Sequence, residues 1–328
     1  MDRFLLMNCF ARVVETGSFS AVARELRTSQ PSVSRYVAVL EEHLGTRLLH
    51  RSTRKLTLTP EGARYYGEVR DILDAVAGAE CNARGIDKPK GLLRLACPTS
   101  LGRVHLLPCV QALLERYPEL EVDLQISDRY VDLVEEGLDL AIRIGHLADS
   151  SLRARTIGVS ERVCVASPDY LARNGIPHHP KELENHNCVT YMLSAEGDHW
   201  PFRDGEVAVN GRFRVNTTDG IFSAAAGGLG IGYGPLWLFE DALSKHQLQL
   251  VLEDYVVASS PINVIYSAKR LVPRRAIVFM DFIADEFGRI SAMQDGALER
   301  LQNLIGHRSK SDAKRNKSIV TRGRMSRT

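Results

Sequence analysis

The sequence lacks a long hydrophobic segment. Among its 328 residues no run approaches the roughly 20 apolar residues that a membrane-spanning helix needs. The first residues also lack the hydrophobic stretch of a secretion signal. We therefore expect a soluble, cytoplasmic protein with no membrane partner. A chain of this length suits two or three domains.

Cysteine is sparse and scattered, without a Cys-x-x-Cys pair or the ligand spacing of a metal site, so no metal is predicted. In a long cytosolic chain most cysteines are expected to be buried as small apolar residues. A redox switch between Cys164 and Cys188 is the less favoured alternative. The six cysteines are Cys9, Cys81, Cys97, Cys109, Cys164 and Cys188.

Catalytic signatures are missing as well: there is no Gly-x-Ser-x-Gly, no His-Glu-x-x-His and no phosphate-binding P-loop. The glycine-rich stretch 227–235 does not fit a dinucleotide fingerprint, because its glycines alternate and follow a predicted helix instead of preceding one. These glycines are more consistent with close packing. We predict neither an enzyme nor a cofactor.

Charge is unevenly distributed behind a net charge of +2. Residues 1–60 contain nine Lys and Arg against five Asp and Glu, and residues 308–328 contain eight against one. Residues 61–307 therefore carry a net charge of −9. Basic ends on an acidic body indicate a polyanionic partner that binds at the ends.

The first 45 residues predict three helices: one over 2–16, a second capped by Ser18, and a third that begins at Ser29 and ends at Gly45. Two short helices, a tight turn and a third helix match the helix-turn-helix unit. A small three-helix packing module is the alternative.

In a helix-turn-helix unit the start of the last helix reaches base edges in the major groove. A Gln side chain can pair with adenine and an Arg side chain with guanine, while Ser suits bases or phosphates. The predicted outward residues are Gln30, Ser32, Ser34 and Arg35.

Residues 48–58 alternate as two short strands around a basic tip, which predicts a hairpin or wing. Arg51, Arg54 and Lys55 at this tip are expected to meet phosphates or the minor groove. An ordinary solvated hairpin is the alternative.

A further helix is predicted from Thr59 and Pro60 onwards. Its apolar residues Tyr66, Val69, Leu73 and Val76 keep a three-four spacing that needs a covering surface. That surface is either the chain's own first domain or the same helix of a second copy. The polar stretch 85–91 indicates a hinge.

From Leu92 strands and helices alternate, which predicts an α/β domain with a parallel sheet, and a second such region spans 163–265. A helix is expected over 130–136 in the first region. Ligands of open α/β sheets bind beyond the carboxyl ends of the strands, often between two halves.

Two loops at strand ends are possible anion sites. Thr99 with Ser100, and Thr217 with Asp219, each open a helix whose hydroxyls and backbone N–H groups suit a carboxylate. Simple helix capping is the alternative for both loops. Arg143 lies in an apolar strand and needs a partner, either a ligand acid or an internal carboxylate.

The stretch ETGSFSAVARELRTSQPSVSRYVAVLEEHLGTRLLHRSTRKLTLTPEG resembles the DNA-binding domain of LysR-type transcriptional regulators. The resemblance places groove contacts at Gln30, Pro31, Ser34 and Arg35, and favours a dimer through the following helix. Residues 91–293, with VDLVEEGLDLAIRIG and AAAGGLGIGYGP, resemble the two-lobed effector domain of that family, whose fold is similar to periplasmic solute-binding proteins. The effector cleft that it implies is bordered by Thr99, Ser100, Arg143, Gly145, Thr217 and Tyr233.

The resulting domain plan has four parts. Residues 1–59 form a winged helix-turn-helix, 60–90 a linker helix with a hinge, 91–305 the effector domain, and 306–328 a basic, disordered tail that adds nonspecific phosphate attraction or only solubility. In the effector domain, lobe I takes about 91–162 and 266–293, and lobe II takes 163–265.

The resemblance implies a cytoplasmic transcriptional regulator that binds double-stranded DNA and responds to a small-molecule effector, such as an organic acid. It implies a homodimer or homotetramer and an influence on DNA bending or on RNA polymerase. Two alternatives stay open: an architectural DNA-binding protein with a vestigial sensor, and an enzyme with a DNA-binding appendage.

Overall fold

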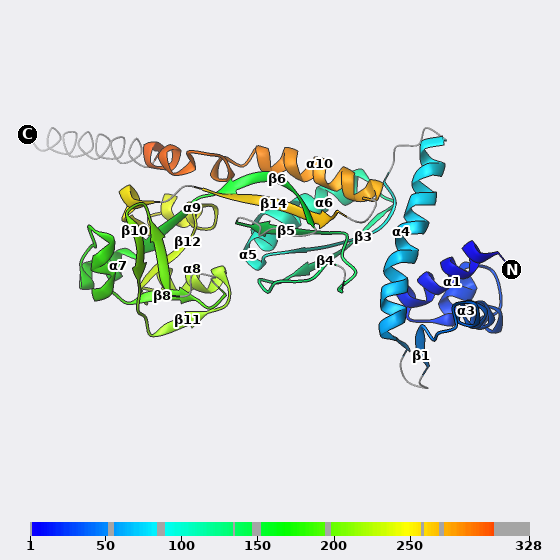
Figure 1. The fold of residues 1–328 in the computed structure, drawn as a ribbon. Coiled ribbons are helices and arrows are strands. Elements are labelled where there is room, and N and C mark those ends of the chain that lie inside the picture. The colour runs from blue at the N-terminus through cyan, green and yellow to red at the C-terminus, as the bar shows by residue number, and fades with distance from the viewer. Residues whose placement is uncertain are drawn as a thin grey trace, which may run out of the picture.

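The computed structural model describes residues 2–51, 56–83, 89–133, 135–145, 152–193, 198–256, 259–268 and 272–304. A helical N-terminal domain lies at one end, and helix α4 stands between it and two α/β lobes that follow one another along the molecule (Figure 1). This order of domains is the predicted one. The basic tail, 306–328, lies outside the described residues.

The N-terminal domain contains the three expected helices, with the expected caps. The Ser18 and Ser29 side chains accept hydrogen bonds from the backbone N–H groups of Ala21 and Ser32. Gly45 ends the third helix with a φ of 66°, a conformation that favours glycine. The helices are α1 (Arg3–Thr16), α2 (Phe19–Glu25) and α3 (Gln30–Leu44).

The wing is a short antiparallel hairpin of β1 (Leu49–Arg51) and β2 (Leu56–Leu58). Its tip, with Arg54 and Lys55, lies outside the described residues. Glu41 of α3 accepts hydrogen bonds from the backbone N–H groups of Leu48 and Leu49, at 2.8 and 3.1 Å. The wing is therefore fixed in position relative to the third helix.

The apolar residues of helix α4 (Pro60–Ala83) are buried or half-buried in its first half and partly exposed in its second half. Val69 is fully buried, and the Tyr66 ring packs edge-on against Phe10 of α1. The first half of the predicted seam thus covers the chain's own domain. In the second half of the predicted seam Leu73 is half-buried and Val76 is 36% exposed, so that half is only partly covered. The neighbouring Ile72, which is not part of the seam, is 43% exposed.

Lobe I is a five-stranded sheet in the order β4-β3-β5-β14-β6. Helix α10 (Arg274–Gly288) runs along one side of it (Figure 1). Buried side chains such as Leu95, Ile142 and Phe279 fill the space between helices and sheet. Its other elements are β3 (Gly91–Cys97), α5 (Thr99–Leu101), the π-helical η1 (Gly102–Leu106), α6 (Leu107–Arg116), β4 (Leu120–Ile126), β5 (Leu140–Ile144), β6 (Leu152–Ser160), β14 (Ser260–Ser267) and the short 3-10 turn η4 (Ser291–Met293).

Lobe II contains a second five-stranded sheet, in the order β11-β8-β12-β7-β13, and a separate hairpin of β9 and β10. The elements are β7 (Arg162–Ala166), α7 (Pro168–Asn174), η2 (Pro180–Asn185), β8 (Cys188–Tyr191), β9 (His199–Phe202), β10 (Gly205–Ala208), β11 (Phe213–Val215), α8 (Thr218–Ala226), β12 (Ile231–Pro235), α9 (Leu236–Ser244), β13 (Gln249–Val251) and η3 (Glu253–Tyr255).

Three expectations are corrected. Neither sheet is all parallel, because β14 pairs antiparallel with β5 and β6, and β7 pairs antiparallel with β12 and β13. The whole of β14 belongs to the lobe I sheet, so lobe II ends before residue 260 and not at 265. The expected helix over 130–136 is absent from its described residues: 130–132 have no regular structure, and 133, 135 and 136 form turns.

No helix within the described ranges has both the length and the apolar character needed to cross a membrane.

Candidate DNA-reading helix and interlobe cleft

Helix α3 lies in the N-terminal domain, at the end of the molecule away from the lobes (Figure 1). Gln30, Pro31 and Arg35 are exposed, whereas Ser32 and Ser34 are half-buried. The Ser32 hydroxyl lies 2.8 Å from that of Ser29, so it also takes part in the helix cap. The opposite side of α3 is held in the core by the fully buried Val33, Val37 and Leu40.

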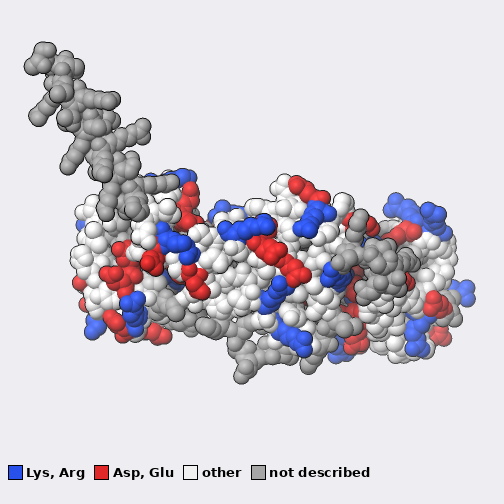
Figure 2. All heavy atoms as spheres, turned by 90° about the horizontal axis from the view of Figure 1, so that it is seen from above, with Lys and Arg blue, Asp and Glu red and all other residues white. Residues whose placement is uncertain are grey.

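Charges of both signs alternate along the face of the molecule that carries α10 (Figure 2). The described residues on that face therefore form no extended basic surface for a polyanion. Of the predicted wing contacts, Arg51 lies in β1 but only its backbone is described. Of the predicted groove residues on α3, Gln30, Pro31 and Arg35 are the exposed ones.

The carboxyl end of β3 brings Thr99 and Ser100 to the boundary between the lobes. The backbone N–H of Thr99 donates to Oδ1 of Asp128, at 2.6 Å. The fully buried Ser100 hydroxyl donates to Oδ2 of Asp219 at 2.9 Å, and lies 2.5 Å from the Thr218 hydroxyl. The Thr99 backbone N–H and the Ser100 hydroxyl thus already donate to carboxylates of the chain.

Asp219 joins the two lobes. Its second oxygen accepts a hydrogen bond of 2.5 Å from the Arg103 guanidinium of η1. Ser100, Arg103, Thr218 and Asp219 form what we call the interlobe latch. Thr217 stands beside this latch and caps α8, since its side chain accepts from the Gly220 N–H at 3.1 Å.

Arg143 is half-buried in β5. Strand β3 lies between β5 and β4, and Asp128 follows the end of β4. The Nη2 of Arg143 donates to the carbonyl of Arg129 at 3.1 Å, while its buried Nε has no hydrogen-bond partner among the described residues. Burial lowers the pKa of this guanidinium, as expected for a desolvated cation. Gly145 follows β5 with its backbone bonded to Pro261 and to the Asn263 side chain.

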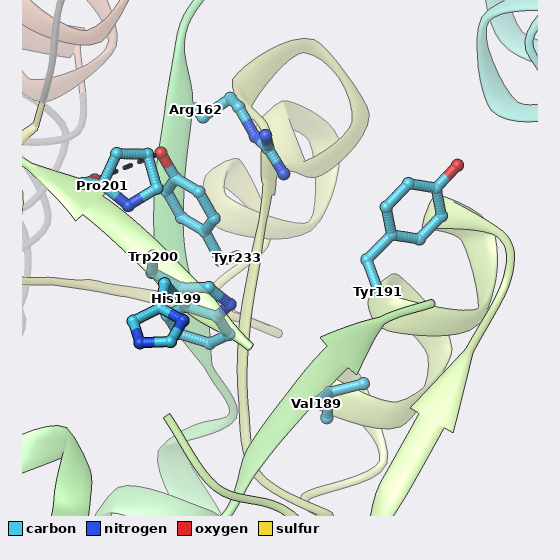
Figure 3. Close-up of a pocket in the computed structure, with 7 residues that line it drawn as sticks. All are labelled: Arg162, Val189, Tyr191, His199, Trp200, Pro201 and Tyr233. Atoms are coloured by element: carbon cyan, nitrogen blue, oxygen red, sulfur yellow. Dashed lines mark hydrogen bonds between the residues drawn. The ribbon is translucent and has the colours of Figure 1, made fainter. Parts of the chain in front are cut away.

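Tyr233 lies in lobe II beside a small pocket (Figure 3). Its ring stacks on Trp200, with centroids 5.3 Å apart, and the Arg162 guanidinium carbon lies 4.5 Å from its centroid. The Tyr191 ring stands across the pocket, with its hydroxyl pointing away from Tyr233 (Figure 3). The pocket volume is about 10 Å³, room for about one water molecule.

Burial raises the pKa of Tyr191 to about 12, and the nearby Asp128 carboxylate adds to this rise. Arg162 and Arg143 act on the same hydroxyl in the opposite direction. Residues of both lobes therefore converge near Tyr191: Asp128 and Arg143 from lobe I, and Arg162 from lobe II.

Asp128, Arg162 and Tyr191 were not among the predicted site residues. Two of them carried a usable signal, since Asp128 comes shortly after β4 and Tyr191 ends β8, and ligand sites gather where parallel strands end. Arg162 had no such signal because it begins its strand.

The two cysteines of the redox alternative lie on β7 and β8, with β12 between these strands. Cys164 and Cys188 are 1% and 0% exposed, and burial raises the pKa of both thiols, that of Cys188 to about 12. Neither thiol has the low pKa or the access of a reactive cysteine. In the described ranges, no group of His, Cys, Asp or Glu residues is arranged to hold a metal ion.

Two family models match the chain. Residues 4–63 match the bacterial regulatory helix-turn-helix protein, lysR family, and residues 87–288 match the LysR substrate binding domain. Among curated relatives, the regulator CrgA of Neisseria meningitidis serogroup C is 35% identical over 290 residues, which cover 86% of this chain and 96% of the relative. The transcriptional activator AaeR of Escherichia coli K12 is 32% identical over 298 residues, which cover 89% of this chain and 96% of AaeR.

Solved structures agree with these matches. CrgA, a LysR-type regulator from Neisseria meningitidis, superposes with a TM-score of 0.58 at 33% identity, covering 87% of this chain and 98% of its own. The Vibrio cholerae virulence activator AphB superposes with a TM-score of 0.54 at 30% identity, and the match covers 87% of this chain and 99% of AphB. Regulators of this type bind DNA and small-molecule effectors, form oligomers and are not enzymes. The chain therefore belongs to the LysR family of helix-turn-helix transcriptional regulators.

Proposed function

We propose that this regulator reads its operator with the start of α3 and that a small organic acid bound between the lobes controls it. The exposed Gln30 and Arg35, on a helix whose other face is locked in the core, carry the DNA-reading part of the proposal. Gln suits adenine and Arg suits guanine in the major groove. The wing residues Arg51, Arg54 and Lys55 complete the interface by binding the DNA backbone.

A second copy of the chain is proposed to pack on the second half of α4. Ile72 and Val76 leave an apolar strip there that the chain's own domain does not cover. A helix pair along this strip sets two α3 helices at a fixed spacing, and hence reads two half-sites. A change in lobe geometry alters that spacing, and with it DNA bending or the access of RNA polymerase. Because its target is chromosomal DNA, we place the protein in the cytoplasm.

The DNA-reading proposal is tested by selecting genomic fragments of the source organism with the purified protein. We expect a few sites with interrupted inverted repeats. In Arg35→Ala, binding at these sites falls about 10- to 100-fold, because a good base contact contributes ~1–3 kcal/mol of discrimination. Arg289→Ala is the control, since Arg289 is 73% exposed and follows α10 in lobe I, away from the proposed interface.

Uniform recovery of fragments regardless of sequence, unchanged in Arg35→Ala, would contradict the proposal. It would mean that nonspecific phosphate attraction, with its strong salt dependence, accounts for the binding.

A further inference from the structure

The boundary between the lobes contains one buried acceptor and one buried donor without partners among the described residues. Asp128 uses only Oδ1, which accepts from Thr99, and its buried Oδ2 has no hydrogen-bond partner among the described residues. The buried Nε of Arg143 likewise has no hydrogen-bond partner among the described residues. Native proteins pair nearly all such groups with protein, water or ligand. A ligand that fits here therefore has both an acceptor and a donor.

Carboxylates of the chain already lie against the other donors described at this boundary. Asp219 occupies the donors of Ser100 and Arg103, and Asp128 occupies the Thr99 N–H. An acid placed there would lie against these two carboxylates and be repelled. The acid group of a ligand is thus directed to the remaining cations, Arg143 and Arg162.

Arg162 is able to reach such a group by leaving the Tyr233 ring on which it rests. The Tyr233 ring is buried, so this cation–π contact is given up at a cost, but the bonds of a guanidinium to a carboxylate are charge-assisted and stronger. The pocket between Arg162 and Tyr191 has room for about one water molecule, so ligand entry requires this rearrangement. Figure 3 shows the Arg162 side chain directed into the space between the two tyrosine rings.

The charge balance selects the kind of donor. Among the half-buried charges here, Arg143 and Arg162 against Asp128 leave one positive charge, because Asp219 is already balanced by Arg103. Glu136 also acts on Arg143, but it is exposed and its charge is screened by solvent. A monoanion with a neutral donor cancels this charge. A zwitterion with an ammonium group leaves it uncancelled.

We propose that the effector is a small hydroxy acid, whose carboxylate binds Arg143 and Arg162 and whose hydroxyl donates to Oδ2 of Asp128. The inference rests on the proposed effector role of the cleft and names the ligand class for it.

Three matched sets of acids test the proposal, each differing only in a hydrogen, a hydroxyl or an ammonium substituent. They are propionate, lactate and alanine; succinate, malate and aspartate; and phenylpropionate, phenyllactate and phenylalanine. Titration calorimetry on the full chain should show that the hydroxy acid of at least one set binds about 10- to 100-fold more tightly than its two counterparts. The reason is that they leave Asp128 unpaired or the charge uncancelled.

Asp128→Asn is the matched variant. The side-chain oxygen of Asn still accepts from the Thr99 N–H, while its amide group replaces the free acceptor Oδ2 by a donor. The preference for the hydroxy acid should fall at least tenfold, and the unsubstituted acid should bind at least as tightly as before, because the variant removes a negative charge near Arg143. Asp123→Asn, on the same segment and 62% exposed, should preserve the preference.

Equal affinities within every set, a stronger amino acid, failure of all three hydroxy acids to bind, or an unchanged preference in Asp128→Asn would each overturn the proposal. The genomic selection above is carried out without ligand. Failure of the ligand class is therefore distinguishable from failure of the DNA-binding function.

Discussion

Arg275→Met is expected to detach α4 from lobe I at a cost of ~3–5 kcal/mol, the usual effect of removing one partner from a buried ion pair. Arg275 of α10 binds Asp74 of α4 through both guanidinium branches, at 2.6 and 2.7 Å. It also lies 3.6 Å from Asp139, which accepts a hydrogen bond of 2.8 Å from Arg70 of α4. The four residues form a crossed cluster of alternating charge, which we call the α4 clamp.

The clamp is largely shielded from water. Arg70, Asp139 and Arg275 are only 7–9% exposed, and Asp74 is 23% exposed. Burial alone would lower the pKa of Arg275, but its bonds to Asp74 and Asp139 outweigh burial and raise it. Without Arg275, one carboxylate of the clamp is left with no cation to balance it. Urea unfolding and hydrogen exchange of the α4 amides measure this loss.

Two further variants decide whether the loss comes from charge. Arg275→Met combined with Asp74→Leu removes a whole pair and should recover most of the stability, because apolar replacements of buried pairs are often neutral. Arg155→Met breaks an exposed pair with Asp281 and should cost less than ~1 kcal/mol. If Arg275→Met costs no more than Arg155→Met, the clamp does not hold the two domains together.

The α4 clamp and the proposed ligand-binding residue Arg143 are connected through strand β5. Asp139 comes directly before β5, and Arg143 of the cleft lies within the same strand. β5 is in the middle of the lobe I sheet, so it moves as a unit with its neighbours. A ligand that pulls on Arg143 therefore acts on the strand that also holds α4 through Asp139. Coupling between the sites requires that ligand and clamp favour different arrangements of this strand, and the clamp variants make that measurable.

The N-terminal domain was predictable because its signals are local. Ser18, Ser29 and Gly45 cap or end helices within a few residues of themselves, and the buried positions of α3 follow its own period. The strand directions in the lobes were not predictable from local signals. The antiparallel strand β14 pairs with β5, which lies more than a hundred residues earlier in the chain. The helix expected over 130–136 failed for a related reason: a short apolar spacing does not distinguish a helix from a turn.

The cleft was only partly predictable. The sequence placed Thr99, Ser100 and Arg143 at strand ends or in a strand where ligands gather, but it did not reveal that Asp128 and Asp219 already occupy the first two. These carboxylates come from 29 and 119 residues away. Which donors stay available for a ligand is thus decided by tertiary contacts, which no local pattern encodes.

Gly62→Ala is the second change with a large expected effect. Gly62 lies in the first turn of α4, where a Cβ atom would be 2.0 Å from the backbone oxygen of Leu48. That oxygen accepts a hydrogen bond from the Thr59 N–H, and Leu48 is fully buried at the start of the wing. Neither backbone can turn aside as a flexible side chain would. We expect a loss of ~1–3 kcal/mol or more, as in other overpacked sites, together with weaker operator binding because the wing shifts.

Gly78→Ala, in the same helix, is expected to have the opposite sign. A Cβ atom at Gly78 meets nothing within 4 Å, so the substitution keeps only the gain in helix propensity, up to ~1 kcal/mol. Denaturant unfolding of the two variants compares these effects in one helix. If Gly62→Ala also stabilised the protein, close contact between α4 and the wing would not be what requires glycine there. The position of the wing would then depend on Glu41 and its two hydrogen bonds to Leu48 and Leu49.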